Sequence, residues 1–377
     1  MITRDSFIAE LDDVKDVNDH CAFIDRRAAA GDRDALLGIF FELNQDRPRS
    51  RIPEWAVGAI LERIIEVLAL TAGYDNAAAA IELAGFVKAG IGIHFRRLHL
   101  PSIASRIVAG QPPEVIDTLL GGLRDSETAA LVLHEAVVRG KLSAPSSAPL
   151  EIQRRLEIAR HPLAVLPLTL LDLEHDIDVP SYKVGLMSAS ALFGPIIERP
   201  AVDADSSIDN FARMETTCPE RSAYISAAIK NWQDESNGQI EARTFYVDSK
   251  FCVLSPSLLP KLGLESVGST DEVSAIPYAV ARDAFTVLFA AASNGGAYNQ
   301  GNFAAYGRLL AWQSLAGLVG ASADAPIHEI ALSAHACQWC LFNATSAWYY
   351  QITWDIGIAC FNPARREIAV LAATDTD

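Results

Sequence analysis

Positive charge is scarce in this sequence. Lysine and arginine number 31 against 47 aspartates and glutamates, so the 377-residue chain has a formal net charge of −16. No basic run is longer than a pair such as Arg26-Arg27 or Arg365-Arg366. A polyanion or an anionic membrane is repelled by such a surface unless a basic patch compensates. We therefore expect neither nucleic acid nor a membrane as a partner.

Long apolar runs and a secretion signal are missing as well. The two most apolar stretches, residues 163–171 and 284–292, cover nine residues each, whereas a membrane span needs roughly twenty. No apolar core of a signal peptide follows Met1. The six cysteines are too sparse for a disulfide-stapled secreted domain. These absences predict a soluble chain in the cytoplasm with reduced thiols.

Catalytic and cofactor motifs are also absent. The chain has no Gly-x-Ser-x-Gly elbow, no P-loop and no dinucleotide fingerprint. Cys337 and Cys340 form a Cys-x-x-Cys pair near His335, which could supply three zinc ligands, but no second ligand pair follows. A thioredoxin-type pair would stand at a helix start after a strand, whereas residues 328–344 are expected to form one helix. We favour core packing for both cysteines and expect no metal and no cofactor.

Helix-forming periodicity fills residues 1–142. Apolar residues recur at three-to-four spacing behind suitable N-caps. No repeat of fixed period is visible, so a helical bundle is favoured over a loose helical solenoid. Ser, Ala and Pro crowd residues 141–150, the best candidate for a linker. We expect an all-helical domain over residues 1–142. Its helices are predicted at residues 5–14, 19–30, 32–44, 54–72, 76–90, 114–123 and 126–139.

Residues 150–377 mix helices with strands. Residues 239–247 alternate in the manner of a strand, and residues 351–361 and 367–373 alternate around a turn, which predicts a closing hairpin. The chain is thus expected to be α+β, with a mainly helical N-terminal region followed by an α+β domain over residues 150–377 that ends in a C-terminal β-hairpin. The helices of this domain are predicted at residues 151–160, 220–233, 277–292, 302–318 and 328–344.

Residues 284–361 are nearly uncharged and rich in aromatic side chains. This stretch of 78 residues holds thirteen of the chain's thirty aromatic residues, and its four formal charges are Arg308, Asp324, Glu329 and Asp355. About a quarter of an average sequence is charged, so most of the stretch must be buried. We expect it to form the core of the C-terminal domain.

Arg308 is the only cation of this stretch. On a helix it shares a face with Trp312, Leu315 and Val319. A buried guanidinium needs a partner because an unpaired charge costs several kcal/mol. One interpretation is a salt bridge to Asp355. A second is a pocket in which Arg308 binds a carboxylate or phosphate of a ligand, and a third is a side chain that reaches back to the surface.

A glycine-rich loop, residues 294–301, precedes the helix of Arg308. Its backbone N–H groups could hold an anion at a helix N-terminus, although a turn that allows close packing explains the glycines more readily. Acid–base work would fall to Asp355, or to Glu241 if its strand lies alongside. The candidate ligand-binding residues are Gly295, Gly296, Tyr298, Tyr306, Arg308 and Trp312, and the candidate catalytic residues are Asp355 and Glu241.

Four segments of residues 235–377 stand out together. They are GGAY at 295–298, AYGRL with AW at 305–312, WDIG at 354–357 and AVLAATDTD at 369–377. This set resembles an uncharacterised bacterial family of unknown function. The resemblance implies that these segments belong to one unit and that residues 369–377 are part of its fold. It implies no activity, cofactor or catalytic residue, and it does not reach the N-terminal helical region.

Three functions fit these observations. A non-enzymatic binding or interaction protein, with a protein as its partner, is favoured by the helical N-terminal region and by the lack of catalytic motifs. The alternative is an enzyme acting on a small anionic substrate in an aromatic-lined pocket around Arg308. A bacterial immunity or defence component is a third candidate that rests on analogy alone. The oligomeric state is left open.

Overall fold

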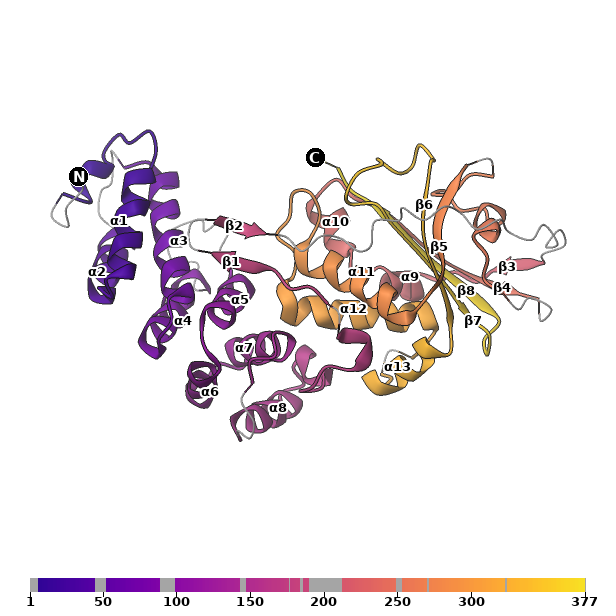
Figure 1. The fold of residues 1–377 in the computed structure, drawn as a ribbon, viewed down its shortest axis with the longest axis horizontal. Coiled ribbons are helices and arrows are strands. Elements are labelled where there is room, and N and C mark those ends of the chain that lie inside the picture. The colour runs from indigo at the N-terminus through magenta and orange to yellow at the C-terminus, as the bar shows by residue number, and fades with distance from the viewer. Residues whose placement is uncertain are drawn as a thin grey trace. The chain divides into compact units, whose positions relative to one another are not determined.

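The chain divides into two compact units in its computed structural model (Figure 1). Unit 1 comprises Met1–Ala164 and Ser181–Ala189, and unit 2 comprises Val165–Pro180 and Ser190–Asp377. The predicted linker, residues 141–150, falls within unit 1. Whether the chain has separate domains at residues 1–142 and 150–377 stays a prediction. The structure describes residues 6–44, 52–88, 99–142, 147–175, 177–183, 186–189, 212–248, 253–269, 271–322 and 324–376, so that part of the predicted linker, residues 143–146, lies outside the described ranges.

Unit 1 is built mainly from helices, as the periodicity predicts. Its helices are α1 (Asn18–Ala29), α2 (Arg33–Asn44), α3 (Glu54–Leu70), α4 (Tyr74–Lys88), α5 (Leu100–Gly110), α6 (Pro113–Gly122), α7 (Ser126–Val138) and α8 (Ala148–Ile158), and β1 (Ser181–Lys183) pairs with β2 (Leu186–Ala189) in a short hairpin. All residues of α7 from Thr128 to Val138 are buried, which is the pattern of a helix at the centre of a bundle. The predicted helix at residues 5–14 is wrong in its described part, which holds only a 3-10 turn, Ala9–Leu11. Asp13, with a φ of 55°, has a left-handed backbone that a helix cannot continue through.

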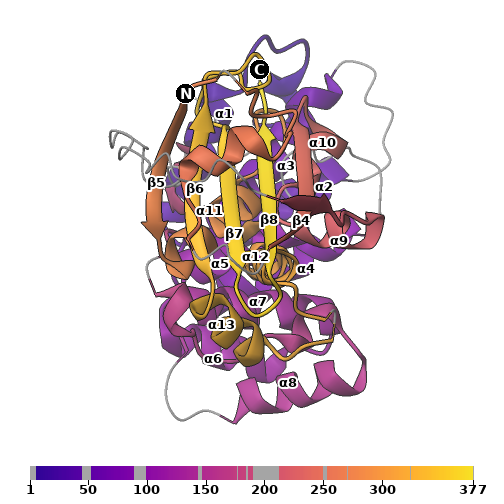
Figure 2. The same ribbon diagram turned by 90° about the vertical axis from the view of Figure 1, so that its right-hand side faces the viewer.

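Unit 2 centres on a six-stranded sheet. Its strands are β3 (Arg213–Glu215), β4 (Gln239–Val247), β5 (Val273–Ala279), β6 (Gln338–Ala344), β7 (Ile356–Asn362) and β8 (Glu367–Thr374). Each strand is antiparallel to its neighbours in the order β3-β4-β8-β7-β6-β5 (Figure 2). The predicted strand at residues 239–247 is confirmed as β4. The predicted hairpin is confirmed as β7 and β8, but its first strand begins at Ile356 and not at residue 351. This hairpin lies in the middle of the sheet because β4 and β6 pair with its two outer edges.

The two faces of the sheet are covered differently. The helices of unit 2 are α9 (Pro219–Ile225), α10 (Lys230–Glu235), α11 (Ala281–Asn294), α12 (Phe303–Val319) and α13 (Ile327–His335). On one face, here called the helix face, α9 contacts β4, α11 contacts β6, and α12 contacts β7 and β8. The opposite face, the loop face, packs against the 3-10 helix η4 (Pro256–Lys261), the residues that follow it and Tyr349. Because side chains alternate along a strand, neighbouring residues of β4 and β8 serve different faces.

Three predicted helices are partly wrong. In residues 220–233, a turn over residues 226–229 separates α9 from α10. In residues 328–344, α13 ends at His335 and β6 begins at Gln338, and in residues 277–292, the first three residues belong to β5. Short apolar runs do not distinguish a buried strand from a buried helix by periodicity. Pairing decides here, because β6 lies between β5 and β7 in the sheet. The α+β class, the helical N-terminal region and the C-terminal hairpin are confirmed.

Candidate functional site

Arg308, the cation of the charge-poor stretch, is fully buried on α12. Its partner is Glu174, which is equally buried and stands in a 3-10 turn, η3 (Asp172–Glu174), of unit 2. Arginine Nε donates to Oε1 at 2.5 Å and Nη2 donates to Oε2 at 2.9 Å. Two further hydrogen bonds reach the carbonyl oxygens of Pro167 at 2.8 Å and Thr169 at 3.0 Å. Four hydrogen bonds therefore engage the guanidinium, two of them in the fork geometry that arginine forms with a carboxylate.

Trp312 shares the same carboxylate. Its indole N–H donates to Oε1 of Glu174 at 2.9 Å, and the tryptophan is fully buried. The interpretation in which Asp355 pairs with Arg308 is wrong. Asp355 binds a side chain on the loop face, Thr374, whereas α12 covers the helix face, so the sheet separates the two charges. Glu174 lies 134 residues before Arg308, and no sequence motif marks it.

The glycine-rich loop does hold an anion, and that anion belongs to the chain. Asp375, which is fully buried at the end of β8, accepts a hydrogen bond from the backbone N–H of Ala297 at 2.7 Å. The side-chain oxygen of Asn299 accepts from the N–H of Gly296 at 3.0 Å. Gly295 ends α11 with a φ of 81°, a conformation that favours glycine. A Cβ atom at Gly296 would lie 2.0 Å from the Asp375 carboxylate, so close packing requires the second glycine.

Asp355 lies on the other face of the same strand end. Thr374 Oγ1 donates to its Oδ1 at 2.6 Å, and the backbone N–H of Ile352 donates to its Oδ2 at 3.2 Å. The N–H of Tyr350 donates in turn to Thr374 Oγ1 at 3.2 Å. Burial raises the pKa of Asp355, and these hydrogen bonds oppose the shift. Asp355 therefore fixes the loop that precedes β7 and remains half-buried.

Glu241 is a buried carboxylate of β4. Its Oε1 accepts from the backbone N–H of Glu265 and its Oε2 from that of Ser266, both at 2.8 Å. Arg243 Nη1 approaches Oε1 at 3.4 Å. Charge-assisted hydrogen bonds from backbone amides are strong, so Glu241 holds the covering segment against the loop face.

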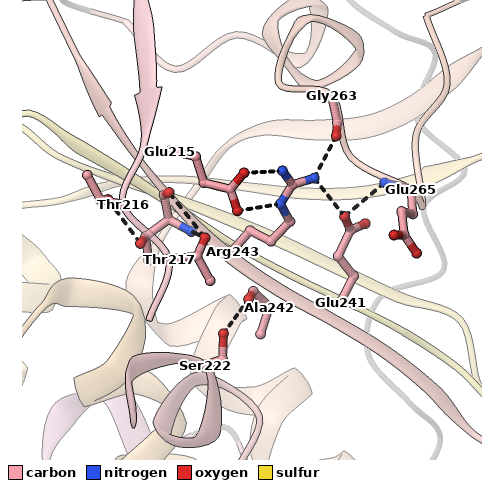
Figure 3. Close-up of polar contacts among 10 residues, drawn as sticks. Glu215, Thr216, Thr217, Ser222, Glu241, Ala242, Arg243, Gly263 and Glu265 are labelled. Carbon is pink, nitrogen blue, oxygen red and sulfur yellow. Dashed lines mark hydrogen bonds and ion pairs between the residues drawn. The ribbon is translucent and has the colours of Figure 1, made fainter. Parts of the chain in front are cut away.

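Arg243 connects this carboxylate to the edge of the sheet. Figure 3 shows its guanidinium between Glu215 of β3 and Glu241 of β4. Nε donates to Glu215 at 3.0 Å, and Nη1 donates to the carbonyl oxygen of Gly263 at 2.6 Å. The hydrogen bond from Arg243 lowers the pKa of Glu215. With Glu215 largely exposed, this cluster is an ion-pair network at the rim of the sheet.

The structure brings the two candidate catalytic carboxylates, Glu241 and Asp355, to the loop face. On β8, Ala372 is the register partner of Glu241 on one side and of Gly357, at the start of β7, on the other. Tyr349 lies within reach of both charges: burial first, and then the negative charges of Asp355 and Glu241, raise its pKa well above the ordinary value. A catalytic role for these carboxylates stays a prediction.

Exposed aromatic and apolar side chains surround this end of the sheet, where Gln239 of β4 pairs with Thr374 of β8. Tyr298 on the glycine-rich loop is 65% exposed, Tyr350 is 42% exposed and Ile352 is 39% exposed. We call these three residues the sheet-end surface. The Tyr350 hydroxyl accepts a hydrogen bond from Gln239 at 3.1 Å. Sequence reasoning missed Tyr350 and Ile352, although they belong to the aromatic segment before β7.

The candidate ligand residues thus fall into separate groups. Tyr298 is exposed at the sheet end, Tyr306 is half-buried on α12, and Arg308 with Trp312 is enclosed around Glu174. Within the described ranges no three His, Cys, Asp or Glu side chains are grouped so as to hold a metal ion. None of the described helices has the length and apolar character needed to cross a membrane.

Comparison with known families agrees with the sequence segments noted above. Residues 18–377 match a family of unknown function, DUF6183. The chain belongs to this family. The DUF6183 match begins at residue 18, the first residue of α1. It therefore also covers the helical region, to which the resemblance of the C-terminal segments did not extend. No curated protein and no solved structure is similar enough to the chain to match it.

Proposed function

We propose that this DUF6183 chain is a binding protein that recognises a protein partner through the sheet-end surface. The observation that carries the proposal is the exposure of Tyr298, Tyr350 and Ile352 on loops whose backbones are hydrogen-bonded to the end of β8. Large side chains on fixed loops lose little conformational entropy on binding. Aromatic residues of this kind are enriched among the anchors of protein interfaces.

The chain's own carboxylates support a binding protein over an enzyme for anionic substrates. Glu174 occupies the guanidinium of Arg308. In the glycine-rich loop, Asp375 occupies the N–H of Ala297 and Asn299 occupies that of Gly296. A small anion would have to displace a buried carboxylate at either place, and a buried charge without its partner is costly. Neither position therefore offers an open anchor.

Charge and cysteine chemistry suggest the kind of partner and the compartment. With a net charge of −16, the chain favours a partner whose contact surface is neutral or basic, because complementary charge speeds association and like charge suppresses it. We further propose a cytoplasmic location. The cysteines of the described ranges are free thiols, the state that reducing compartments maintain.

The test compares partner capture by a triple variant of the sheet-end surface with capture by a double variant that serves as the control. Both are made in the full chain. The sheet-end variant carries Tyr298→Ser, Tyr350→Ser and Ile352→Ser. The control carries Val280→Ser and Leu332→Ser, whose side chains are 57% and 68% exposed at other places on unit 2. Each variant is tagged, expressed in the native cell and analysed by quantitative mass spectrometry of the proteins that co-purify.

A partner retained by the unchanged chain and by the control should be lost at least about tenfold with the sheet-end variant, because truncating an interface anchor costs about 2 kcal/mol or more. Equal recovery with all three proteins would contradict the proposal. So would a strictly monomeric protein from which no partner is recovered.

An enzyme that uses Asp355 as a general acid or base is the second candidate. It is favoured by the raised pKa of this half-buried carboxyl group and by the nearness of Tyr349 and Glu241, since such shifts are frequent at catalytic sites. Incubating the chain with a metabolite extract tests it. A compound consumed by the unchanged chain and left intact by Asp355→Asn would favour the enzyme over the binding protein.

A further inference from the structure

The cysteine pair that the sequence suggests is divided by the sheet. In the register of β6 and β7, Trp339 lies opposite Cys360 and Cys340 lies opposite Ala359. Cys340 belongs to the apolar cluster of the loop face. Cys360 points to the opposite, helix face because it alternates with Ala359, another member of that cluster. Cys337 and Cys340 are therefore not a functional pair.

Cys337 has a different neighbour, Cys360. Cys337 stands in the turn between α13 and β6, two residues before Trp339, and so on the same side of the sheet as Cys360. Cys337 lies close enough to the Cys360 thiol to raise its pKa. Cys360 is fully buried, whereas Cys337 is partly exposed. Only 22 residues separate them in the chain, but no sequence motif links them, because their approach depends on the pairing of two strands.

The surroundings of the pair are polar on one side. Arg221 of α9 forms an ion pair with Glu367 of β8 at 2.7 Å, and the charges of both residues act on the Cys360 thiol. Glu367 lies two residues from Ala369, the register partner of Cys360, so it faces the same side of the sheet. The ion pair supplies opposite charges beside the thiols.

We propose that Cys337 and Cys360 form a reversible disulfide when the chain meets a hydroperoxide. In the first step, the sulfur of Cys337 attacks the O–O bond of hydrogen peroxide, which yields a sulfenic acid on Cys337 and releases one water molecule. In the second step, the sulfur of Cys360 attacks the Cys337 sulfur and the S–OH bond breaks. The thiol proton of Cys360 leaves with the hydroxyl group as a second water molecule. Exchange with a small dithiol reverses the reaction.

Accessibility and acidity assign the order of these steps. Burial raises the pKa of Cys360 well above its ordinary value, and the neighbouring Cys337 raises it further. The thiolate is the nucleophile, so the partly exposed Cys337, which a peroxide can reach, is oxidised first. Cys340 cannot act as the resolving thiol because its side chain lies on the loop face, away from Cys337. Cys360 acts as the resolving thiol because it already contacts Cys337.

The consequence of oxidation would be local. A disulfide between Cys337 and Cys360 would attach the end of α13 to β7, the first strand of the central hairpin. Such a link restricts the unfolded chain and so stabilises unit 2. The oxidised chain is therefore expected to unfold at a higher urea concentration than the reduced chain.

The test uses the full chain in reduced form with stoichiometric hydrogen peroxide. Free thiols are alkylated before and after reduction with a dithiol, and mass spectrometry maps the linkage. We expect a peptide pair linked through Cys337 and Cys360, and the same linkage in Cys340→Ala. Cys337→Ala should abolish the linkage. Cys360→Ala should abolish it too and leave a sulfenic acid on Cys337 that dimedone traps.

Several results would overturn the proposal. A linkage between Cys337 and Cys340, a linkage only between chains, or oxidation confined to the exposed Cys218 would each exclude the pair. If Cys360→Ala fails to fold, the unchanged chain still decides the matter. In that protein, Cys337 and Cys360 must lose reactivity toward the first alkylating agent together, whereas independent loss contradicts a shared disulfide.

Discussion

The buried pair of Arg308 and Glu174 makes a sharp energetic prediction. In Glu174→Gln the shape of the side chain is kept and its charge is removed. The Glu174 carboxylate accepts two hydrogen bonds from Arg308, one from the indole of Trp312 and one from the backbone N–H of Leu171. A glutamine amide replaces one acceptor oxygen by a donor, so two of these four hydrogen bonds lose their acceptor.

The magnitude follows from burial. Both partners are fully buried, so the guanidinium in Glu174→Gln has neither water nor a carboxylate to balance its charge. Removing one partner of a buried ion pair typically costs about 3–5 kcal/mol. The exposed pair of Arg243 and Glu215 is the matched control, because Glu215 is 44% exposed and surface pairs contribute only about 0–1 kcal/mol. Glu215→Gln should therefore change stability by less than about 1 kcal/mol.

Urea unfolding of the full chain measures both effects. Tryptophan fluorescence reports mainly on unit 2, which holds Trp312 and four of the other five tryptophans, and circular dichroism reports on the fold as a whole. A double-mutant cycle adds Arg308→Met alone and in the Glu174→Gln background. The summed losses in free energy of unfolding of the two single variants should exceed the loss of the double variant by about 2–3 kcal/mol, as for residues in direct contact.

A different outcome would return Arg308 to the role of a ligand anchor. If Arg308→Met unfolds at the same urea concentration as the unchanged chain, the guanidinium does not stabilise unit 2. Additive losses in the double-mutant cycle would likewise refute the pairing with Glu174.

Three further predictions test other parts of the structure. Gly296→Ala should destabilise unit 2 by about 1–3 kcal/mol, because the new Cβ displaces the Asp375 carboxylate and leaves a buried N–H unpaired. Gly85→Ala is the control, because the new Cβ meets open space on α4. It should stabilise unit 1 by up to about 1 kcal/mol in the same urea assay. Burial lowers the pKa of His20 below 6.5, so the unfolded chain binds a proton more readily than the folded chain. The free energy of unfolding should therefore be constant above pH 6.5 and fall below it. In His20→Gln, the free energy of unfolding should change less between pH 5 and 8, by at most about 1.4 kcal/mol per pH unit. Tyr182→Phe should cost about 1 kcal/mol in thermal unfolding because the hydroxyl contacts Ser105 Oγ at 3.0 Å, whereas Tyr182→Ala should cost several times more because the ring also stacks against Arg106 and Arg139.

Local patterns allowed much of the fold to be predicted. Residues 239–247 alternate strictly enough to give the bounds of β4, and the same alternation around a turn gives the final hairpin. The lack of charge in residues 284–361 correctly indicates burial. Even Arg308, the only cation in that stretch, is buried. Where an apolar run is short, as at residues 338–344, helix and strand remain indistinguishable until a neighbouring strand pairs with it.

The partners of the buried charges could not be predicted in this way. The sequence required a carboxylate for Arg308 and allowed an anion for the glycine-rich loop, and both requirements are met by residues far along the chain, Glu174 and Asp375. Such contacts depend on tertiary packing, and neither aspartate nor glutamate carries a local signal of its future partner. The carboxylate that the sequence suggested within the charge-poor stretch, Asp355, lies on the opposite face of the sheet.

Amide hydrogen exchange of the glycine-rich loop tests most directly whether the loops of the sheet-end surface are fixed by the chain's own carboxylates. The N–H of Ala297 should exchange slowly in the unchanged chain and at least about tenfold faster in Asp375→Ala, since a hydrogen bond to a charged group contributes about 1.5–3 kcal/mol. The exposed Asp324→Ala serves as the control and should leave the rate unchanged. Rapid exchange of Ala297 in the unchanged chain, or equal rates in all three proteins, would contradict the account.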